Sequence, residues 1–380
     1  MILIKNACVK TMAGSDLKNG CVLIGDDGKI AGVGEDLSAP EAEIVDAGGR
    51  LVTPGCVEAH CHTGLRDLNV ADYNEKSDPI TPHLRAIDAV HPQDEYFSDA
   101  VRGGVTTVCT GPGSTNVVGG TFAAVKTFGV RVDKMVVKDP VAMKCAFGHN
   151  PKNAFGNAGK KQPYTRMAIA MLLRDLLTRA KTYQEEKDSG KNPKYDAKLE
   201  AMLPVMRKEI PLKAHAHRAD DILTAVRIAK EFGLKMTLDH CTEGHLIAEE
   251  LAEEGYPALV GPTLGGKSKM ELFNKTFDTP GVLHKAGLKV CIITDAGVIP
   301  IQFLPMCAGL AASRGLPMEE AWRAITVNPA EVMGIADRVG TLEPGKDADV
   351  VIWTADPLTT IGGEAYMTFI DGKLAWKKGN

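Results

Sequence analysis

Two histidines separated by one residue follow a short apolar run in the first part of the chain. They are His60 and His62, in the segment VTPGCVEAHCHTGLRD (52–67). Side chains at positions i and i+2 of an extended segment point to the same side of it, and imidazole is a preferred ligand of zinc. This pair can therefore hold one metal ion, provided that the rest of the chain completes the site.

Further residues able to bind a metal stand at the ends of later apolar runs. They are His215, His217, His240 and Asp295. In a parallel barrel, the C-terminal ends of the strands meet at one face, where the following loops converge. One histidine at a strand end is usually a packing residue. A full set is not explained by packing, because buried imidazoles and carboxylates without partners are costly. The pattern predicts a metal centre.

Short apolar runs alternate with amphipathic helical stretches through the middle of the chain, which is the pattern of a parallel α/β sheet or barrel. Strands are predicted at 56–62, 105–111, 141–148, 211–217, 234–240, 256–262 and 288–295, with an eighth at 121–129. Two of the helical stretches end in glycine, as helices commonly do. We therefore expect an α/β fold with an eight-stranded barrel.

Both ends of the chain are rich in short strands and turns. The simplest arrangement joins residues 1–53 and 341–380 into one small β-sandwich domain and leaves 54–340 as the barrel. Residues from about 160 to 208 predict one or two long helices, inserted as a cap over the site or as a subunit interface. We expect a homo-oligomer that uses this insertion.

The composition argues against several classes of function. The net charge is −4, and the lysines of 187–198 are interleaved with acids, so no phosphate-binding patch and no nucleic-acid partner are expected. No run of about 20 apolar residues occurs, and the first apolar run is too short for a secretory signal. The nine cysteines without CxxC spacing are typical of reduced, buried thiols. We expect a cytoplasmic protein that acts on a small molecule, away from membranes.

Several motifs resemble those of the amidohydrolase superfamily. PGCVEAHCH is similar to its PGxxDxHxH signature, and KAHAH, LDH and TDA are similar to its later strand motifs. TVNPAEVMGIADRVGTLEPGKDADVVIW resembles its C-terminal segment. The resemblance covers almost the whole chain and is strongest to the imidazolonepropionase-like and prolidase-like branch. It implies a TIM-like (β/α)8 barrel and metal-dependent hydrolysis of C–N bonds in cyclic or peptide-like substrates.

The resemblance also implies a set of metal ligands. They are His60, His62, His215, His240 and Asp295. The chain departs from the signature at Glu58, where many members have Asp; a carboxylate remains, and we expect it to orient the histidines. The expected cofactor is a divalent metal, zinc before iron, manganese or nickel, which lowers the pKa of bound water toward about 7.

Three residues are assigned catalytic roles. Asp295 is expected to accept the proton of the water and to return it to the leaving nitrogen. His217 has the spacing to share the site with His215, and we assign it to polarising the substrate carbonyl, with an outer-sphere or substrate-contact role as the alternative. If Asp295 does not carry the proton, His217 and His240 are the next candidates.

The number of metal ions is left open. Two-metal members of the superfamily bridge their ions with a carboxylated lysine or with a glutamate from the third or fourth strand. The segment VAMKCAFGHN offers Lys144 within the strand and His149 just after it. An ordinary buried lysine is an equal alternative for Lys144, and His149 stands where similar relatives usually have Glu. Because a histidine bridges two ions poorly, we expect one strong metal site and an optional second one.

Other functions are weighed beside the hydrolase of an amide, lactam or cyclic imidazolone. A deaminase of a cyclic amidine commonly carries a His-x-x-Glu pair on the fifth-strand side, where this chain has HAHRADD. A metal-free scaffold is disfavoured because the ligand set is full. Lys267 and Lys269 follow the seventh strand and are either contacts for a substrate carboxylate or solvated loop lysines.

Overall fold

The computed structural model describes residues 1–66, 72–159 and 161–379. Its central sheet contains β6 (Cys56–Cys61), β7 (Val105–Thr110), β8 (Val118–Lys126), β9 (Val136–Ala146), β10 (Leu212–Ala216), β11 (Met236–His240), β12 (Ala258–Val260) and β13 (Val290–Ile292), paired in this order. The N–H of His62, just after β6, donates to the carbonyl of Ala296, beyond β13, at 2.7 Å. The two edges of the sheet therefore lie side by side, and the barrel is nearly closed.

One strand of the barrel runs against the others. β8 pairs antiparallel with β7 and with β9, whereas the other pairs are parallel. Only residues 111–117 connect β7 to β8, and a parallel crossover needs a dozen or more residues. The expectation of eight regular (β/α) units is therefore wrong here. The eighth strand, predicted at 121–129 and found at Val118–Lys126, forms hairpins with its neighbours.

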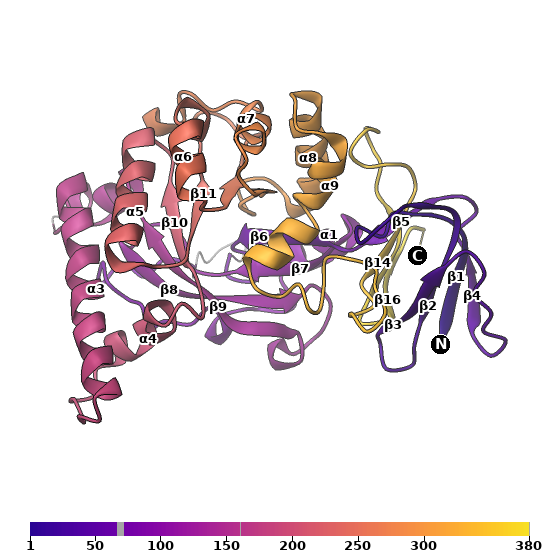
Figure 1. Ribbon diagram of the computed structural model, residues 1–380, viewed down its shortest axis with the longest axis horizontal. Helices are drawn as coiled ribbons and strands as arrows, with labels where there is room; N and C mark the ends of the chain where they lie inside the picture. The colour runs from indigo at the N-terminus through magenta and orange to yellow at the C-terminus, as the bar shows by residue number, and fades with distance from the viewer. Residues whose placement is uncertain (67–71, 160, 380) are drawn as a thin grey trace.

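Helices surround the barrel (Figure 1). They are α1 (Glu95–Arg102), α2 (His149–Pro151), α5 (Ala219–Phe232), α6 (Ala248–Glu254), α7 (Thr279–Lys285), α8 (Leu304–Ser313), α9 (Met318–Arg323) and α10 (Val327–Val332). Single turns occur at Ala86–Asp88, Val132–Lys134, Lys152–Asn157, Gly244–Leu246, Met270–Leu272 and Ile301–Phe303. In α5, Ile222, Ala225 and Ala229 are buried at helical spacing, and Gly233 ends the helix with φ +61°. The main apolar core joins these helices to the strands.

The helical insertion contains α3 (Arg166–Asp188) and α4 (Ala197–Met206). Residue 160, at the start of the predicted range, lies outside the described residues. α3 packs against α4 and α5, and it lies at the opposite end of the molecule from the two termini (Figure 1). Among the helices that the structure describes, α3 included, none has the length and the hydropathy to cross a membrane.

The two ends of the chain share a second sheet. Its strands are β1 (Ile2–Val9), β2 (Leu17–Ile24), β3 (Ile30–Gly34), β4 (Glu43–Asp46), β5 (Leu51–Pro54), β14 (Val350–Trp353), β15 (Ala365–Ile370) and β16 (Lys373–Lys377). β5 pairs antiparallel with β14, which joins the N-terminal strands to the C-terminal ones. These pairings form a single eight-stranded sheet, so they do not confirm the two packed layers of the predicted β-sandwich.

A buried ion cluster attaches this terminal sheet to the barrel. Lys126 at the end of β8 places its Nζ 2.9 Å from Asp347 Oδ2, 2.8 Å from Asp349 Oδ2 and 3.3 Å from Asp371 Oδ1. Arg338 adds a contact of 2.8 Å to Asp347. Burial lowers the pKa of Lys126, but the three carboxylates outweigh burial and raise it above its usual value. Lys126 therefore stays charged near neutral pH, and its contacts join the terminal sheet to the barrel.

Candidate metal centre

The predicted ligands meet at the C-terminal ends of the barrel strands. They are His60 in β6 and His62 just after it, His215 in β10 and His217 just after it, His240 at the end of β11, and Asp295 beyond β13. His240 and Asp295 have φ values of +70° and +52°. Residues other than glycine rarely adopt this left-handed region, and such strain concentrates at functional sites. The strand ends thus turn their side chains into the mouth of the barrel.

Two groups of three possible ligands lie side by side. His60, His62 and Asp295 form one group, whose ligand atoms all lie within 4.8 Å of one another. His215, His217 and His240 form the other by the same measure. The rings of His60 and His240 are 5.0 Å apart between their centroids, so the two groups are neighbours. Apart from Asp295, which is partly exposed, these side chains are buried.

Every imidazole in the two groups uses Nδ1 for a contact with the surrounding protein. The partners are Asp239 Oδ2 for His60 (2.6 Å), the Gly111 carbonyl for His62 (2.7 Å), Ser114 Oγ for His215 (2.8 Å), Thr242 Oγ1 for His217 (2.8 Å) and the Gly261 carbonyl for His240 (2.7 Å). A carbonyl can only accept, so Nδ1 of His62 and of His240 carries the proton. Their Nε2 lone pairs are therefore free to bind a metal, an arrangement that protein metal sites commonly use.

The inner atoms of the site fit a cation. Nε2 of His62 lies 3.2 Å from Asp295 Oδ1, and Nε2 of His60 lies 3.6 Å from the same oxygen. In the neutral tautomer with its proton on Nδ1, the Nε2 lone pair of His62 and the carboxylate repel each other unless a positive charge lies between them. Among the described residues, neither His240 Nε2 nor Asp295 Oδ1 has a hydrogen-bond partner, although both are buried. A set of imidazole nitrogens and one carboxylate is the donor set that zinc and similar divalent metals prefer.

The protonation states favour metal binding at neutral pH. Burial, followed by the neighbouring charges, holds the pKa of His215 and of His217 well below the usual value, and burial lowers that of His240 to about 4. These imidazoles are therefore neutral at pH 7. Burial raises the pKa of Asp295, but its contacts with His62 and His240 outweigh burial, and the pKa falls well below its usual value. Asp295 is therefore a carboxylate.

Asp239 is a functional candidate that sequence reasoning missed. Its Oδ2 lies 2.6 Å from His60 Nδ1 and 3.1 Å from Lys213 Nζ, and all three side chains are fully buried. Burial raises the pKa of Asp239, but Lys213 and then His60 outweigh burial and lower it well below its usual value. The signal was visible, because Asp239 directly precedes His240 in the LDH motif. The histidine that Asp239 contacts, His60, could not be predicted from the motif, because the two residues meet only when the barrel closes.

Lys144 is brought into the site, whereas His149 is not. Nζ of Lys144 lies 3.2 Å from His60 Nε2, and burial lowers its pKa to about 8. A fraction of neutral amine is therefore present near neutral pH. The imidazole of His149 is exposed and belongs to neither group of ligands, while its backbone N–H donates to Glu271 Oε2 at 3.0 Å. The neighbouring Asn150 instead approaches His215, with Nδ2 at 3.5 Å from Nε2.

Glu58 holds the seam of the barrel and does not enter the ligand set. Its Oε1 accepts the N–H of His60 at 3.0 Å, and its Oε2 accepts the N–H and the hydroxyl of Thr294 at 2.8 and 2.6 Å. Thr294 directly precedes Asp295, so one carboxylate fixes the backbone on both sides of the first ligand group. Burial raises the pKa of Glu58 to about 7.

A cavity of about 350 Å³ opens onto the ligands. His62, His215, His217 and Asp295 line its floor side. Further lining residues that sequence reasoning did not single out include Arg66, Tyr73, Asn150 and Lys275. Tyr73 stacks on the ring of His62 at 4.9 Å between centroids. The volume suits a small molecule rather than a macromolecule.

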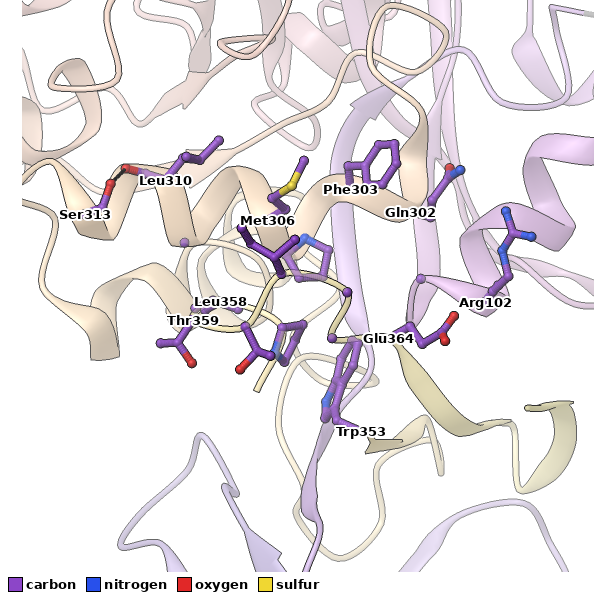
Figure 2. Close-up of a pocket in the computed structure, with 18 residues that line it drawn as sticks. Arg102, Gln302, Phe303, Met306, Leu310, Ser313, Trp353, Leu358, Thr359 and Glu364 are labelled. Carbon is purple, nitrogen blue, oxygen red and sulfur yellow. Dashed lines mark hydrogen bonds between the residues drawn. The ribbon is translucent and has the colours of Figure 1, made fainter. Parts of the chain in front are cut away.

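A larger cavity of about 610 Å³ lies elsewhere, between α8 and the segment 353–364 of the terminal sheet (Figure 2). Its apolar lining residues include Phe303, Met306, Leu310, Trp353 and Leu358. Arg102 and Glu364 are the only charged side chains among the described residues that line it, and no histidine does. Its size therefore does not make it the reaction site, because one carboxylate without any imidazole beside it, among the described lining residues, does not form a metal centre.

Three comparisons with known proteins bear on this site. Residues 51–375 match the model described as "Amidohydrolase family". The crystal structure of an amidohydrolase from Thermotoga maritima MSB8 is 41% identical over 100% of both chains, with a TM-score of 0.95. An amidohydrolase, tasK, from Hapsidospora irregularis is 29% identical over 87% of this chain but only 37% of its own length. An imidazolonepropionase from Rhizobium rhizogenes is 23% identical over 91% of this chain and 89% of its own.

Proposed function

The chain belongs to the amidohydrolase family and is a hydrolase acting on C–N bonds, and we propose that its substrate is a small amide, lactam or cyclic imidazolone. One observation carries this proposal above the others. His62, His215, His217 and Asp295 line one small cavity, and His60 and His240 complete the two ligand groups beside them. The family is metal-dependent, and this donor set is suited to a divalent metal.

The first group, His60, His62 and Asp295, is our choice for the strong metal site. His215 and His240 of the second group would hold the optional second ion, and Lys144 lies 3.2 Å from His60 of the first group. We propose zinc, because neutral imidazoles with one carboxylate suit it well, with iron, manganese and nickel as alternatives. When bound, such an ion supplies Lewis acidity, which acidifies water and polarises a carbonyl oxygen.

Asp295 is the proton acceptor in this proposal. Its Oδ1 is buried, has no hydrogen-bond donor among the described residues and lies between the imidazoles. As an ionised carboxylate at the cavity, it can take a proton from the attacking water at Oδ1 and return it to the leaving nitrogen. An open-chain amide then gives an acid and an amine in equal amounts, whereas a lactam or cyclic imidazolone gives one ring-opened product.

His217 is suited to holding the substrate carbonyl oxygen. Its Nδ1 contacts Thr242, whose hydroxyl can donate as well as accept, so this imidazole, unlike those of His62 and His240, can carry its proton on Nε2. Nε2–H at the cavity wall would then donate to the developing oxyanion. His240, with Nδ1 bound to a carbonyl, has no proton on Nε2 and is better placed as a ligand or as a second proton acceptor.

The deaminase alternative finds less support in the site. The residue three positions after His217 is Asp220, which is exposed and pairs with Arg218 at 3.0 Å instead of facing the cavity. In the described part of the chain, the acid near His217 is instead Glu271, from a different segment, with Oε1 at 3.8 Å from Nε2. The metal-free scaffold is disfavoured by the two groups of buried ligand atoms.

The test combines metal analysis with a substrate screen. Purified protein should contain near-stoichiometric zinc, iron, manganese or nickel. Metal-loaded protein is then offered cyclic amides, N-acyl amino acids and dipeptides, and the acid and amine products are quantified. Release of ammonia from amidines without ring or amide cleavage would favour the deaminase. Absence of metal and of any turnover would favour the scaffold.

We further propose a cytoplasmic location. All nine cysteines are unpaired, and eight of them are buried. Burial raises the pKa of thiols such as Cys56 and Cys291, so they behave as small apolar side chains in a reducing compartment.

A further inference from the structure

The cavity over the ligand groups carries more positive than negative charge. Its charged lining residues among the described ones are Arg66, Lys269, Lys275 and Asp295. Asp295 belongs to the first ligand group. Lys269 is neutralised, since its Nζ lies 2.6 Å from Glu271 Oε1 and also donates to Asn150 Oδ1 at 3.0 Å. Two cations therefore remain without a carboxylate partner in the described part of the chain: Arg66 and Lys275.

Arg66 retains hydrogen-bonding capacity toward the cavity. It follows the first pair of ligands by four residues, and its guanidinium donates through one nitrogen to the carbonyl of Gly297. No carboxylate of the described residues lies within ion-pair distance of it. A guanidinium has five N–H donors in a planar fork, which matches the two oxygens of a carboxylate. The bond to Gly297 fixes the fork beside the loop that carries Asp295.

Lys275 contributes charge from the loop after β12. Its Nζ donates to the carbonyls of Pro262, Gly265 and Gly266, at 3.4 and 3.2 Å for the first and last of these. These acceptors are neutral, so they hold the ammonium in place without cancelling its charge. Burial and then Lys267 lower the pKa of Lys275, and its charge in turn contributes to lowering the pKa of His217. The field of Lys275 therefore reaches the ligand groups.

We propose that the substrate carries a carboxylate and that Arg66, supported by the charge of Lys275, binds it while the scissile C–N bond faces the ligand groups. This inference rests on the proposed function, because it assumes that the substrate enters this cavity. Both cations and the ligands line the same space of about 350 Å³, so a small acid can contact both ends at once. Lys267, one of the two lysines singled out in the sequence, does not line the cavity; its Nζ is directed to the carbonyl of Phe273 at 2.6 Å.

The experiment measures discrimination between matched compounds on zinc-loaded, full-length protein. N-acyl amino acids and lactam carboxylic acids are each paired with the same compound bearing a methyl group in place of the carboxylate. Calorimetry measures binding of each pair, and product assays measure kcat and KM. We expect the acid to be preferred by about 10- to 100-fold, the size of one charge-assisted hydrogen bond, mainly through affinity and KM.

Variants of Arg66 and Lys275 test whether these two cations cause the preference for the acid. Arg66→Met should remove most of it, Lys275→Met should reduce it, and Lys275→Arg should restore part of it, whereas the matched control Lys267→Met should keep it. The acid and the neutral compound are compared in the same variant. General damage to the loops would weaken binding of both compounds and would therefore leave the ratio of their affinities unchanged. Equal binding of the pair by the wild type, or an unchanged preference in Arg66→Met and Lys275→Met, overturns the inference.

The inference and the proposed function fail in different ways. Preferred binding of the acids without hydrolysis of any compound would uphold the carboxylate site and reject the hydrolase. Hydrolysis of acids and neutral compounds at equal kcat/KM would uphold the hydrolase and reject the carboxylate site. Tighter binding of phosphonates than of carboxylates would also overturn the assignment to carboxylates.

Discussion

Oδ2 of Asp239 lies 2.6 Å from Nδ1 of His60, although β11 and β6, the strands that carry them, are not paired in the barrel sheet. The contact crosses the interior of the barrel and links the second ligand group, through the neighbour of His240, to the first. A carboxylate behind a histidine ligand fixes its ring and tautomer and raises the basicity of the other nitrogen. Asp239 is therefore expected to set the metal affinity of His60 without being a ligand.

Replacing Asp239 by Asn should weaken metal binding at the first ligand group. The amide keeps the size of the side chain but loses the charge that orients His60, and removal of such an outer partner typically costs about 10- to 100-fold in metal affinity. Competition with a chelator of known affinity measures the change. Affinity within a factor of two of the wild type would show that Asp239 does not act on His60.

The control for this variant concerns folding. Asp239→Asn leaves the buried Lys213 without its partner, and breaking a buried pair commonly costs about 3–5 kcal/mol. The double variant Asp239→Asn with Lys213→Met removes that unpaired charge. It should recover stability in urea unfolding but not metal affinity, which separates the positioning of His60 from a general loss of structure.

Replacing His60 or His62 by Ala should remove most of the bound metal while the barrel stays folded. Both Nε2 atoms lie within 3.6 Å of Asp295 Oδ1, so each variant removes one arm of the first ligand group. Elemental analysis measures the metal, and circular dichroism reports the fold. His149→Ala is the matched control, since that imidazole is exposed. Full metal content in both variants would rule out this site.

Replacing Asp295 by Asn should separate catalysis from metal binding. The amide keeps one acceptor oxygen and the size of the side chain but cannot take a proton. We expect much of the metal to remain and kcat to fall by about 10²–10⁴-fold, the usual contribution of a general base. The acidic limb of the pH–rate profile should be lost as well. Near-normal kcat in the metal-loaded variant would mean that another residue accepts the proton, with His217 and His240 as the next candidates.

The free energy of unfolding should depend on pH through Asp347, which belongs to the ion cluster around Lys126 at the end of β8. Burial raises its pKa, but Lys126 and Lys29 outweigh burial and bring it below its usual value. A carboxyl group whose pKa is lower in the folded state stabilises the protein above the unfolded-state pKa of about 3.8 and loses that contribution as the pH falls further. Lys126 keeps Asp349 and Asp371 as partners after this change, so Asp347→Asn should cost about 1–3 kcal/mol at pH 7.

Urea unfolding at several pH values checks this sign. The difference between wild type and Asp347→Asn should be the same at about pH 7 and 5 and should shrink at about pH 3.5. Asp133→Asn is a suitable control, because that carboxylate is exposed and pairs only with Arg131 among the described residues. A difference that already shrinks between pH 7 and 5 would contradict the assignment.

We also propose a homo-oligomer formed through the insertion. Met167 and Met171 of α3 are 78% and 49% exposed, and large exposed apolar side chains on one helix favour a subunit contact. Light scattering should give a mass above the 40.6 kDa of one chain, and Met167→Glu with Met171→Glu should lower it to that value. A monomer of the wild type at micromolar concentration would reject this interface.

The sequence by itself determined the candidate ligands and the class of fold. Short apolar runs with a histidine or aspartate at the end are a local pattern, and strand geometry alone places residues i and i+2, such as His60 and His62, on one side. The eight barrel strands and an insertion of one or two helices were predicted from the same local periodicities. Family motifs then identified the reaction class, which the family match confirms.

The tertiary structure decided what depends on closure of the barrel. His60 and Asp239 are 179 residues apart in the chain, so no local periodicity predicts their contact. β8 runs antiparallel because the connection from β7, residues 111–117, is too short for a parallel crossover. His149 lies three residues after the end of β9 and is exposed. Arg66 and Lys275 come from different loops, and their shared cavity exists only once both loops are packed over the strand ends. Side-chain type is local, whereas which side chains share a space is a property of the whole fold.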